Sequence, residues 1–167
     1  LDKFTCGDTD LRRYLQIESG MEIIGGVYSE NAVIQTGTGG NGKSTYNNAK
    51  HMVLGDYAGT IPADLLTMSY KKSKGPEYAE LRGKRFILAA ELQEGMRLDT
   101  AALKNLCSTD PIRAEKKFEA PFDFIPTHTT VLYTNHLPKV GTVDKGTWDR
   151  IIVVPLSANF RGSGDEI

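Results

Sequence analysis

The chain has 167 residues, of which 40% are hydrophobic, and this suffices for one globular domain with a buried core. Its formal net charge is −1, which excludes binding of nucleic acid through general basicity, so any such site has to be local. Two cysteines and three scattered histidines show no metal-ligand spacing, and no apolar run approaches the roughly 20 residues of a membrane-spanning helix.

The first predicted elements are a helix and a short strand. Apolar residues recur at helical spacing between residues 5 and 27, where Thr9 or Asp10 could cap a helix and Gly25 could help to end it. The apolar run Ala32–Gln35 then predicts a strand.

A complete P-loop signature follows this strand and precedes a predicted helix from Ser44 to about Leu54. It consists of Gly37, Thr38, Gly39, Gly40, Asn41, Gly42, Lys43, Ser44 and Thr45. Glycines let backbone N–H groups close around phosphate oxygens, and the helix start adds unpaired donors. We expect Lys43 to reach the β- and γ-phosphates and the Ser44 hydroxyl to bind Mg²⁺. The strand–loop–helix context favours a nucleoside triphosphate site over an ordinary glycine-rich turn.

The remaining chain alternates short apolar strands with helices. We expect a strand ending near Ile61, a polar surface loop over residues 68–78 with a Gly75–Pro76 breaker, and a buried strand over residues 85–90. A helix over residues 98–107, a hairpin over 112–125 and strands over 129–133 and 151–154 follow. This pattern predicts an α/β fold with a mostly parallel central sheet and helices on both faces.

Candidate catalytic groups follow two of these strands. Glu91 closes the strand over residues 85–90, so it is positioned to act on Mg²⁺ or on the attacking water, and Glu94 is a weaker candidate nearby. Asn135 follows the strand over residues 129–133, where its amide could bond the γ-phosphate or the attacking water. The plainer alternatives are a solvated acid for Glu91 and an ordinary turn residue for Asn135.

Arg150 precedes the last strand, and two basic stretches remain. Arg150 could act as an arginine finger on a neighbouring subunit, or simply pair with Asp149 or another acid. Basic residues interleaved with three phenylalanines suit single-stranded nucleic acid, although core phenylalanines and solvated lysines would give the same composition. The basic residues of this segment are Lys104, Arg113, Lys116 and Lys117. The second stretch, residues 71–85, is open to the same plain interpretation.

The order of these motifs resembles the superfamily 3 helicase domain of phage, plasmid and poxvirus primase-helicases. The resemblance runs from about residue 20 to 155, through the P-loop, residues 81–85 with Glu91, residues 104–113, Tyr133–Pro138 and Gly146–Arg150. It implies a P-loop NTPase fold of the AAA+ type, a three-layer sandwich with a short N-terminal helical segment and an inserted β-hairpin.

The resemblance also implies roles for residues and partners. Gly37, Gly42, Lys43 and Ser44 match Walker A, Glu91 matches the Walker B acid, Asn135 the sensor and Arg150 the trans-acting arginine. Lys104–Lys117 matches the segment leading into a DNA-contacting hairpin. The implied cofactors are ATP and Mg²⁺, and the implied partners are single-stranded DNA and further copies in a hexameric ring. The implied setting is the cytoplasm of a bacterial host, for a protein encoded by a phage, prophage or plasmid.

The chain departs from the family pattern in three motifs. The hairpin motif has Cys107–Asp110 in place of a usual glycine pair, the tryptophan is followed by a single arginine, and Glu91 lacks a paired acid. These departures leave the metal partner open between Glu91 and Glu94. We expect residues 1–28 to belong to a collar or linker and residues 29–167 to form the ATPase core, in a longer protein whose lid lies outside this chain.

Three functions are compatible with these observations. The leading hypothesis is an ATP-dependent DNA helicase core that hydrolyses ATP at subunit interfaces and translocates on single-stranded DNA. The alternatives are a P-loop module that binds nucleotide as an assembly switch without unwinding, and a phosphotransferase acting on a small substrate. The phosphotransferase is disfavoured because no arginine-rich lid stands out in the sequence.

Overall fold

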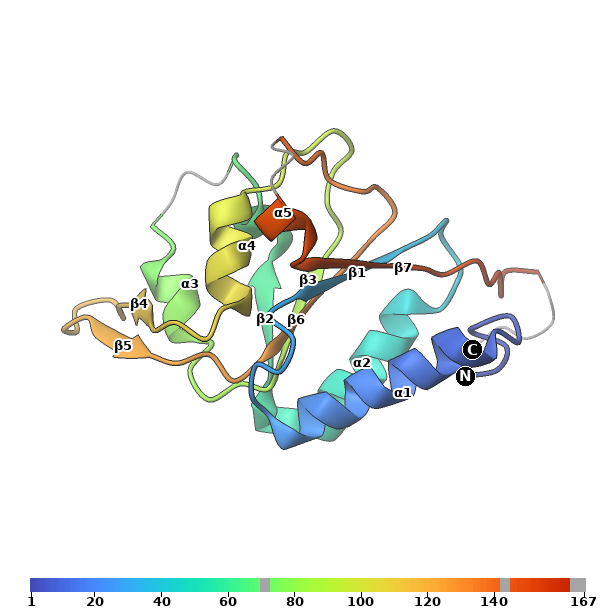
Figure 1. Ribbon diagram of the computed structural model, residues 1–167, viewed down its shortest axis with the longest axis horizontal. Coiled ribbons are helices and arrows are strands. Elements are labelled where there is room, and N and C mark those ends of the chain that lie inside the picture. The colour runs from blue at the N-terminus through green and yellow to red at the C-terminus, as the bar shows by residue number, and fades with distance from the viewer. Residues whose placement is uncertain (70–72, 142–144, 163–167) are drawn as a thin grey trace.

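The computed structural model describes residues 1–69, 73–141 and 145–162. Its centre is a five-stranded sheet in which every neighbouring pair is parallel (Figure 1). The strand order is β2 (Ala58–Pro62), β3 (Phe86–Ala90), β6 (Thr129–Thr134), β1 (Ala32–Thr36) and β7 (Ile151–Pro155). The prediction of a parallel α/β sheet is therefore confirmed.

Five α-helices accompany the sheet in the described part of the chain: α1 (Thr9–Ile24), α2 (Lys43–Leu54), α3 (Gly75–Ala79), α4 (Thr100–Cys107) and α5 (Lys145–Trp148). Short 3₁₀ turns, η1 (Gly55–Tyr57) and η2 (Ala63–Leu66), flank β2. None of the helices described here has the length and apolarity needed to span a bilayer.

The two faces of the sheet are covered by different helices. Side chains alternate along each strand, so Val33 and Val131 join α1 and α2 in one cluster, whereas Ile34 and Leu132 join α4 in another. Figure 1 shows α1 and α2 on one side of the sheet and α4 on the other. These two apolar cores give the three-layer sandwich predicted from the sequence.

Three local predictions differ from the structure. Asp8 caps α1, its carboxylate accepting from the backbone N–H groups of Asp10 and Leu11, in place of Thr9 or Asp10. The Gly75–Pro76 pair opens α3 instead of breaking structure, because a proline in the first turn of a helix loses no helical hydrogen bond. The helix α5 was not predicted, since its four residues are too few for a periodic pattern.

The predicted hairpin forms a separate two-stranded antiparallel sheet of β4 (Ile112–Ala114) and β5 (Phe122–Phe124). It is inserted between α4 and β6 and extends away from the central sheet, beside α3 (Figure 1). Of the second basic stretch, Lys71 and Lys72 lie outside the described residues.

The parallel sheet decides which functional candidates can meet. Residues that follow β1, β3 and β6 emerge at the same edge, so the P-loop, Glu91 and Asn135 belong together. Arg150 precedes β7 and therefore lies at the opposite edge.

Candidate functional site

A cavity of about 490 Å³ opens at the carboxyl edge of the sheet, within the size range of small-molecule sites. The P-loop, two strand ends and the segment after β7 supply its walls. Its lining residues are Gly39, Gly40, Asn41, Gly42, Lys43, Ser44, Thr45, Glu91, Tyr133, Asn135, Phe160 and Arg161.

The P-loop needs its glycines for conformation and for space. Gly42 occupies the left-handed region with φ of 81° and precedes the first turn of α2. A Cβ on Gly37 would overlap the carbonyl oxygen of Leu156, and a Cβ on Gly40 would lie 2.7 Å from the Cγ of Arg161. A side chain at these positions would therefore fill the space that shapes the loop.

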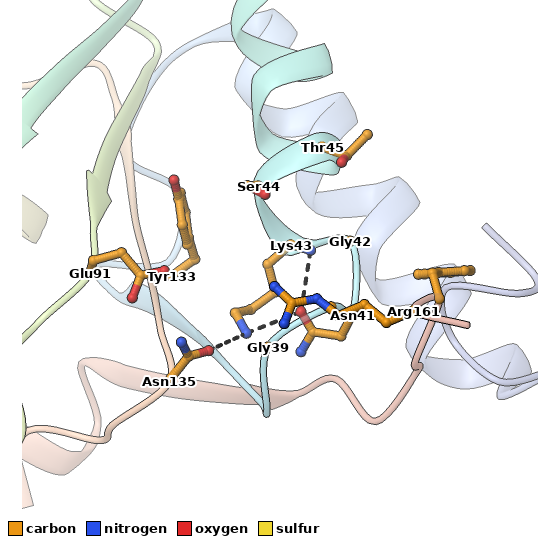
Figure 2. Close-up of a pocket in the computed structure, with 12 residues that line it drawn as sticks. Gly39, Asn41, Gly42, Lys43, Ser44, Thr45, Glu91, Tyr133, Asn135 and Arg161 are labelled. Atoms are coloured by element: carbon orange, nitrogen blue, oxygen red, sulfur yellow. Dashed lines mark hydrogen bonds between the residues drawn. The ribbon is translucent and has the colours of Figure 1, made fainter. Parts of the chain in front are cut away.

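Lys43 links the P-loop to the neighbouring strand. Its Nζ donates to the Gly37 carbonyl oxygen at 2.8 Å. It also donates to Asn41 Oδ1 at 3.1 Å and to Asn135 Oδ1 at 3.0 Å (Figure 2). Burial lowers the pKa of Lys43, and the negative charge of Glu91 opposes that shift. All three acceptors are neutral, so the ammonium charge remains available to an anion.

The two candidate acids are separated by the structure. Glu91 lines the cavity, in a left-handed conformation with φ of 60° that directs the chain away from β3. Its backbone N–H donates to the carbonyl oxygen of Tyr133 at 3.0 Å, which ties the ends of β3 and β6 together. Glu94 is exposed and is not among the residues that line the cavity.

Asn135 and Tyr133 enter from the end of β6. Alternation along the strand buries Thr134 and turns its two neighbours toward the cavity. Burial raises the pKa of Tyr133, and the Glu91 carboxylate raises it further. Tyr133 was not among the site residues predicted from the sequence, although its spacing of two residues from Asn135 could have identified it.

The outer wall is the segment after β7, which includes Phe160 and Arg161 and was not predicted from the sequence. After β7, the backbone N–H of Leu156 donates to the Thr36 carbonyl oxygen at 2.8 Å, and that of Phe160 donates to the Gly40 carbonyl oxygen at 2.8 Å. Arg161 lies across the loop, on the side of Lys43 opposite Glu91 (Figure 2). Its position follows from the pairing of β7 with β1, and no local sequence pattern indicates that pairing.

The residues present fit a magnesium-bound nucleotide. Mg²⁺ in such sites is held by one or two carboxylates together with substrate phosphates and water. Of the residues that line the cavity, Glu91 supplies a carboxylate, and Ser44, Thr45 and Tyr133 carry hydroxyls, of which that of Ser44 directly follows Lys43. Within residues 1–69, 73–141 and 145–162 no group of three or more potential acidic, histidine or cysteine ligands occurs, so the phosphates would have to contribute ligands.

Arg150 is not part of this cavity. Its Nη2 pairs with Glu30 Oε2 at 3.1 Å and its Nη1 donates to the Gly146 carbonyl oxygen at 3.0 Å. Asp149, the acid suggested as its partner from the sequence, pairs with Lys145 instead. The five residues of β7 separate Arg150 from the cavity edge by about 16 Å at the usual rise per residue.

The four basic candidates for DNA binding are distributed over α4 and the hairpin. Lys104 is half-buried on α4, and Arg113 pairs with Asp123 across the hairpin stem at 3.3 Å. Lys116 and Lys117 are exposed in the hairpin tip. Phe118 beside them is 95% exposed, with the Lys117 ammonium 4.9 Å from its ring centre.

The three phenylalanines of the hairpin therefore have different environments. Phe124 is buried in the core and Phe122 is half-buried, packing against that core, as the plain interpretation requires. Phe118 fits the alternative, because it presents an aromatic face next to positive charge.

A family model described as "Family of unknown function (DUF5906)" matches residues 35–150. Curated relatives come from large DNA viruses. A protein of Acanthamoeba polyphaga mimivirus is 30% identical over 92% of this chain, and one of Invertebrate iridescent virus 6 is 29% identical over 96%. Both carry names that assign them as helicases by inference. A protein of African swine fever virus named by inference as a primase is 27% identical over 86% of the chain.

Solved structures share the fold at low identity. The apo structure of the NrS-1 C-terminal region superposes with a TM-score of 0.73 at 14% identity, over 99% of this chain and 39% of that one. JCV helicase, solved with a small molecule bound, gives a TM-score of 0.56 at 10% identity over 92% of this chain and 42% of that one. Together with the viral relatives, these matches confirm the resemblance to the superfamily 3 helicase domain.

The chain covers 16%, 17% and 15% of the length of the mimivirus, iridescent virus and swine fever virus relatives. It therefore corresponds to one region of proteins that are several times longer.

Proposed function

The chain belongs to the family of unknown function DUF5906, and we propose that it is the ATPase core of a replicative helicase. Its viral relatives support a helicase–primase type of function in general terms. The finer proposal is that Mg²⁺·ATP binds the P-loop at a subunit interface, and that hydrolysis moves the hairpin along single-stranded DNA.

One observation carries this proposal: Lys43 Nζ and Asn135 Oδ1 lie 3.0 Å apart in a cavity that Glu91 also lines. A lysine at the start of α2, the helix after β1, thus meets a carboxylate and an amide that follow β3 and β6 at one edge of the sheet. That set suits phosphoryl transfer to water, in which catalysis consists of positioning and of stabilising charge.

In the proposed mechanism, the P-loop N–H groups and Lys43 hold the β- and γ-phosphates. Ser44 and Glu91 would hold Mg²⁺, which when bound neutralises phosphate charge. Glu91 orients the attacking water through its carboxylate, and the Asn135 amide donates to the γ-phosphate or to the same water. Arg150 of a neighbouring copy supplies positive charge to the transition state.

The DNA-binding part of the proposal rests on the hairpin. Lys116 and Lys117 would contact phosphates, and Phe118 would stack on a base. Lys104 and Arg113 are candidates for secondary phosphate contacts, with Arg113 held in place by Asp123. Neither mode of contact requires a particular base, so binding should tolerate different sequences.

The arrangement of the longer protein is also a proposal. Residues 1–28 would belong to a collar or linker and residues 29–167 to the core, with a hexameric ring as the working assembly. A bacterial host and a phage or plasmid origin remain predictions from the resemblance alone, since the relatives named above belong to mimivirus, an iridescent virus and African swine fever virus.

The test is the ATPase rate of the full-length protein with and without single-stranded DNA, with its oligomeric state measured in parallel. We expect DNA to stimulate hydrolysis, and Lys43→Ala to abolish it. ATP binding that drives assembly without DNA-stimulated hydrolysis would instead favour the assembly-switch alternative. Unchanged hydrolysis by the Lys43→Ala protein would refute the P-loop assignment.

A further inference from the structure

The segment after β7 brings a second cation to the P-loop. Leu156 is buried, and its carbonyl oxygen accepts from Asn41 Nδ2 at 3.1 Å. Four residues later, the backbone of Phe160 bonds the Gly40 carbonyl oxygen, and its ring approaches Gly42, where a Cβ would lie 3.1 Å from Cε2. These contacts fix the segment along the outer side of the loop at both ends.

This anchoring determines where Arg161 lies. Its backbone N–H donates to Asn159 Oδ1 at 3.1 Å, forming a local turn directly after the Phe160 contact. The aliphatic stem packs on Gly40, and a Cβ on Gly39 would lie 3.9 Å from Nη2. The guanidinium thus lies over the glycines of the loop and lines the cavity (Figure 2).

The guanidinium has no ion-pair or hydrogen-bond partner among the residues that the structure describes. By contrast, Arg113 pairs with Asp123 and Arg150 pairs with Glu30. Arginine presents several N–H donors in a planar fork that matches phosphate oxygens, so an arginine at an anion-binding loop has an evident ligand class.

We propose that Arg161 binds the phosphate chain of the nucleotide from the same subunit, opposite Glu91 and beside Lys43. This inference rests on the proposed function and extends it: the site would have its own second cation before any neighbouring subunit contributes Arg150. A nucleoside triphosphate carries more negative charge than Lys43 alone can balance, and the Arg161 guanidinium would offset a further negative charge. Arg161 is accordingly a binding residue for polyphosphate, and its contribution does not depend on the base.

The test compares nucleotide with a ligand that has no base. Binding of a fluorescent ATP analogue with Mg²⁺ is measured on the full chain, and unlabelled ATP or inorganic tripolyphosphate is used as competitor. We expect Arg161→Ala to lower the affinity for ATP and the affinity for tripolyphosphate by about tenfold each, as for a lost charge-assisted hydrogen bond. Arg161→Lys, which keeps the charge, should restore part of this loss. Arg13→Ala, which removes an exposed arginine of α1 that is not among the cavity-lining residues, should bind like the unmodified chain.

The outcomes separate this inference from the function on which it rests. If Lys43→Ala loses binding and Arg161→Ala does not, the helicase-core proposal stands and the role of Arg161 is refuted. A loss of ATP affinity with unchanged tripolyphosphate affinity would also refute it, because Arg161 would then contact the base. If the unmodified chain binds neither competitor, the proposed nucleotide site fails, and the inference fails with it.

Discussion

At the scale of single residues, the two ends of the Asn135 amide have different partners: the oxygen contacts Lys43, and the nitrogen is left for a ligand. Asn135 Oδ1 accepts from Lys43 Nζ, which leaves the two N–H donors of its amide for another partner in the cavity. Lys43 is also held by Gly37 and Asn41, so its position does not depend on Asn135 alone. Binding and catalysis should therefore respond differently to loss of this amide.

We predict that Asn135→Ala lowers kcat for ATP hydrolysis by about 100-fold, the order expected for one lost donor to the transition state. ATP affinity should change little, because the P-loop and Lys43 still hold the phosphates. Steady-state hydrolysis by the assembled protein, combined with equilibrium binding of ATP, measures both quantities. Asn105→Ala, at an exposed position on α4, is the matched control. Equal losses of affinity and rate would contradict a catalytic role for Asn135.

At the scale of elements, α1 and α2 are joined by a buried cluster of charges. Lys50 Nζ lies 2.8 Å from Glu22 Oε1 and 3.8 Å from Glu18 Oε2, and all three side chains are buried. One ammonium serves two carboxylates, so the cluster cannot be neutral when both acids are ionised. Burial raises the pKa of Glu22 to about 7 despite the attraction of Lys50, and burial raises the pKa of Glu18 as well.

This cluster predicts a pH-dependent stability. An acid whose pKa is higher in the folded than in the unfolded chain binds its proton more tightly when folded. Its contribution is full below the unfolded pKa near 4.5 and is lost as the pH rises through about 7. Relative to Glu22→Gln, the unmodified chain should lose about 2 kcal/mol of unfolding free energy between pH 5 and 8. Urea unfolding across this range measures the difference.

A comparison with a surface acid makes that result specific. Glu80→Gln removes an exposed carboxylate next to α3, so its stability should parallel the unmodified chain at every pH. A Glu22→Gln protein with the same pH profile as the unmodified chain would mean that Glu22 is already ionised at pH 5 in the folded state. Glu22 would then not be the group that holds a proton in this range.

The hairpin is the element on which DNA binding is predicted to depend. Lys116→Ala combined with Lys117→Ala should weaken single-stranded DNA binding and reduce the salt slope of log affinity by about 1.4, or about 0.7 per phosphate contact. Phe118→Ala should weaken binding by about 1 kcal/mol or more through lost stacking, with the salt slope unchanged. Fluorescence anisotropy with a labelled oligonucleotide at several salt concentrations separates the two effects.

The control for charge is a pair of exposed basic residues elsewhere, Arg13→Ala with Lys139→Ala. This pair lowers the net charge by the same amount without touching the hairpin. If it weakens DNA binding as much as the lysine pair does, then long-range charge is responsible and the hairpin assignment fails.

The elements also show what sequence reasoning can reach. Strands of four to six apolar residues and the P-loop were predictable because local periodicity and glycine spacing encode them. Asn135 and Glu91 could be assigned to one edge because the carboxyl ends of parallel strands coincide. Arg161 could not, since its contact with Gly40 depends on β7 pairing with β1, more than 100 residues apart in the chain. The Lys50–Glu22 pair depends in the same way on how α1 packs.

At the scale of the whole molecule, the central sheet separates the nucleotide cavity from Arg150. The P-loop and Asn135 lie at its carboxyl edge, whereas Arg150 lies at its amino edge, about 16 Å away along β7. Arg150 therefore cannot reach the cavity of its own chain, and its pairing with Glu30 holds it at the amino edge. In a ring, the amino edge of the sheet in one copy could face the carboxyl edge of the sheet in the next copy. This arrangement agrees with a trans-acting role for Arg150.

This geometry predicts complementation between two inactive proteins. Arg150→Ala should reduce ATP hydrolysis by the assembled protein by about 1,000-fold, as for other arginine fingers, without weakening ATP binding. Lys43→Ala should abolish hydrolysis by removing phosphate binding. When the two variants are mixed, an interface with Lys43 from one copy and Arg150 from the other is intact, so part of the activity should return. Hydrolysis measured against the mixing ratio, with assembly monitored by light scattering, detects this recovery.

Two controls assign that recovery to the interface. Arg150→Ala mixed with the double variant Lys43→Ala plus Arg150→Ala contains no intact interface, so it should stay inactive. Glu30→Gln keeps the finger but removes its ion pair within the chain, so it should hydrolyse ATP in assembled form while Arg150→Ala does not. If the mixture of single variants stays inactive although both co-assemble, Arg150 does not act across a subunit interface, and its pairing with Glu30 is only structural.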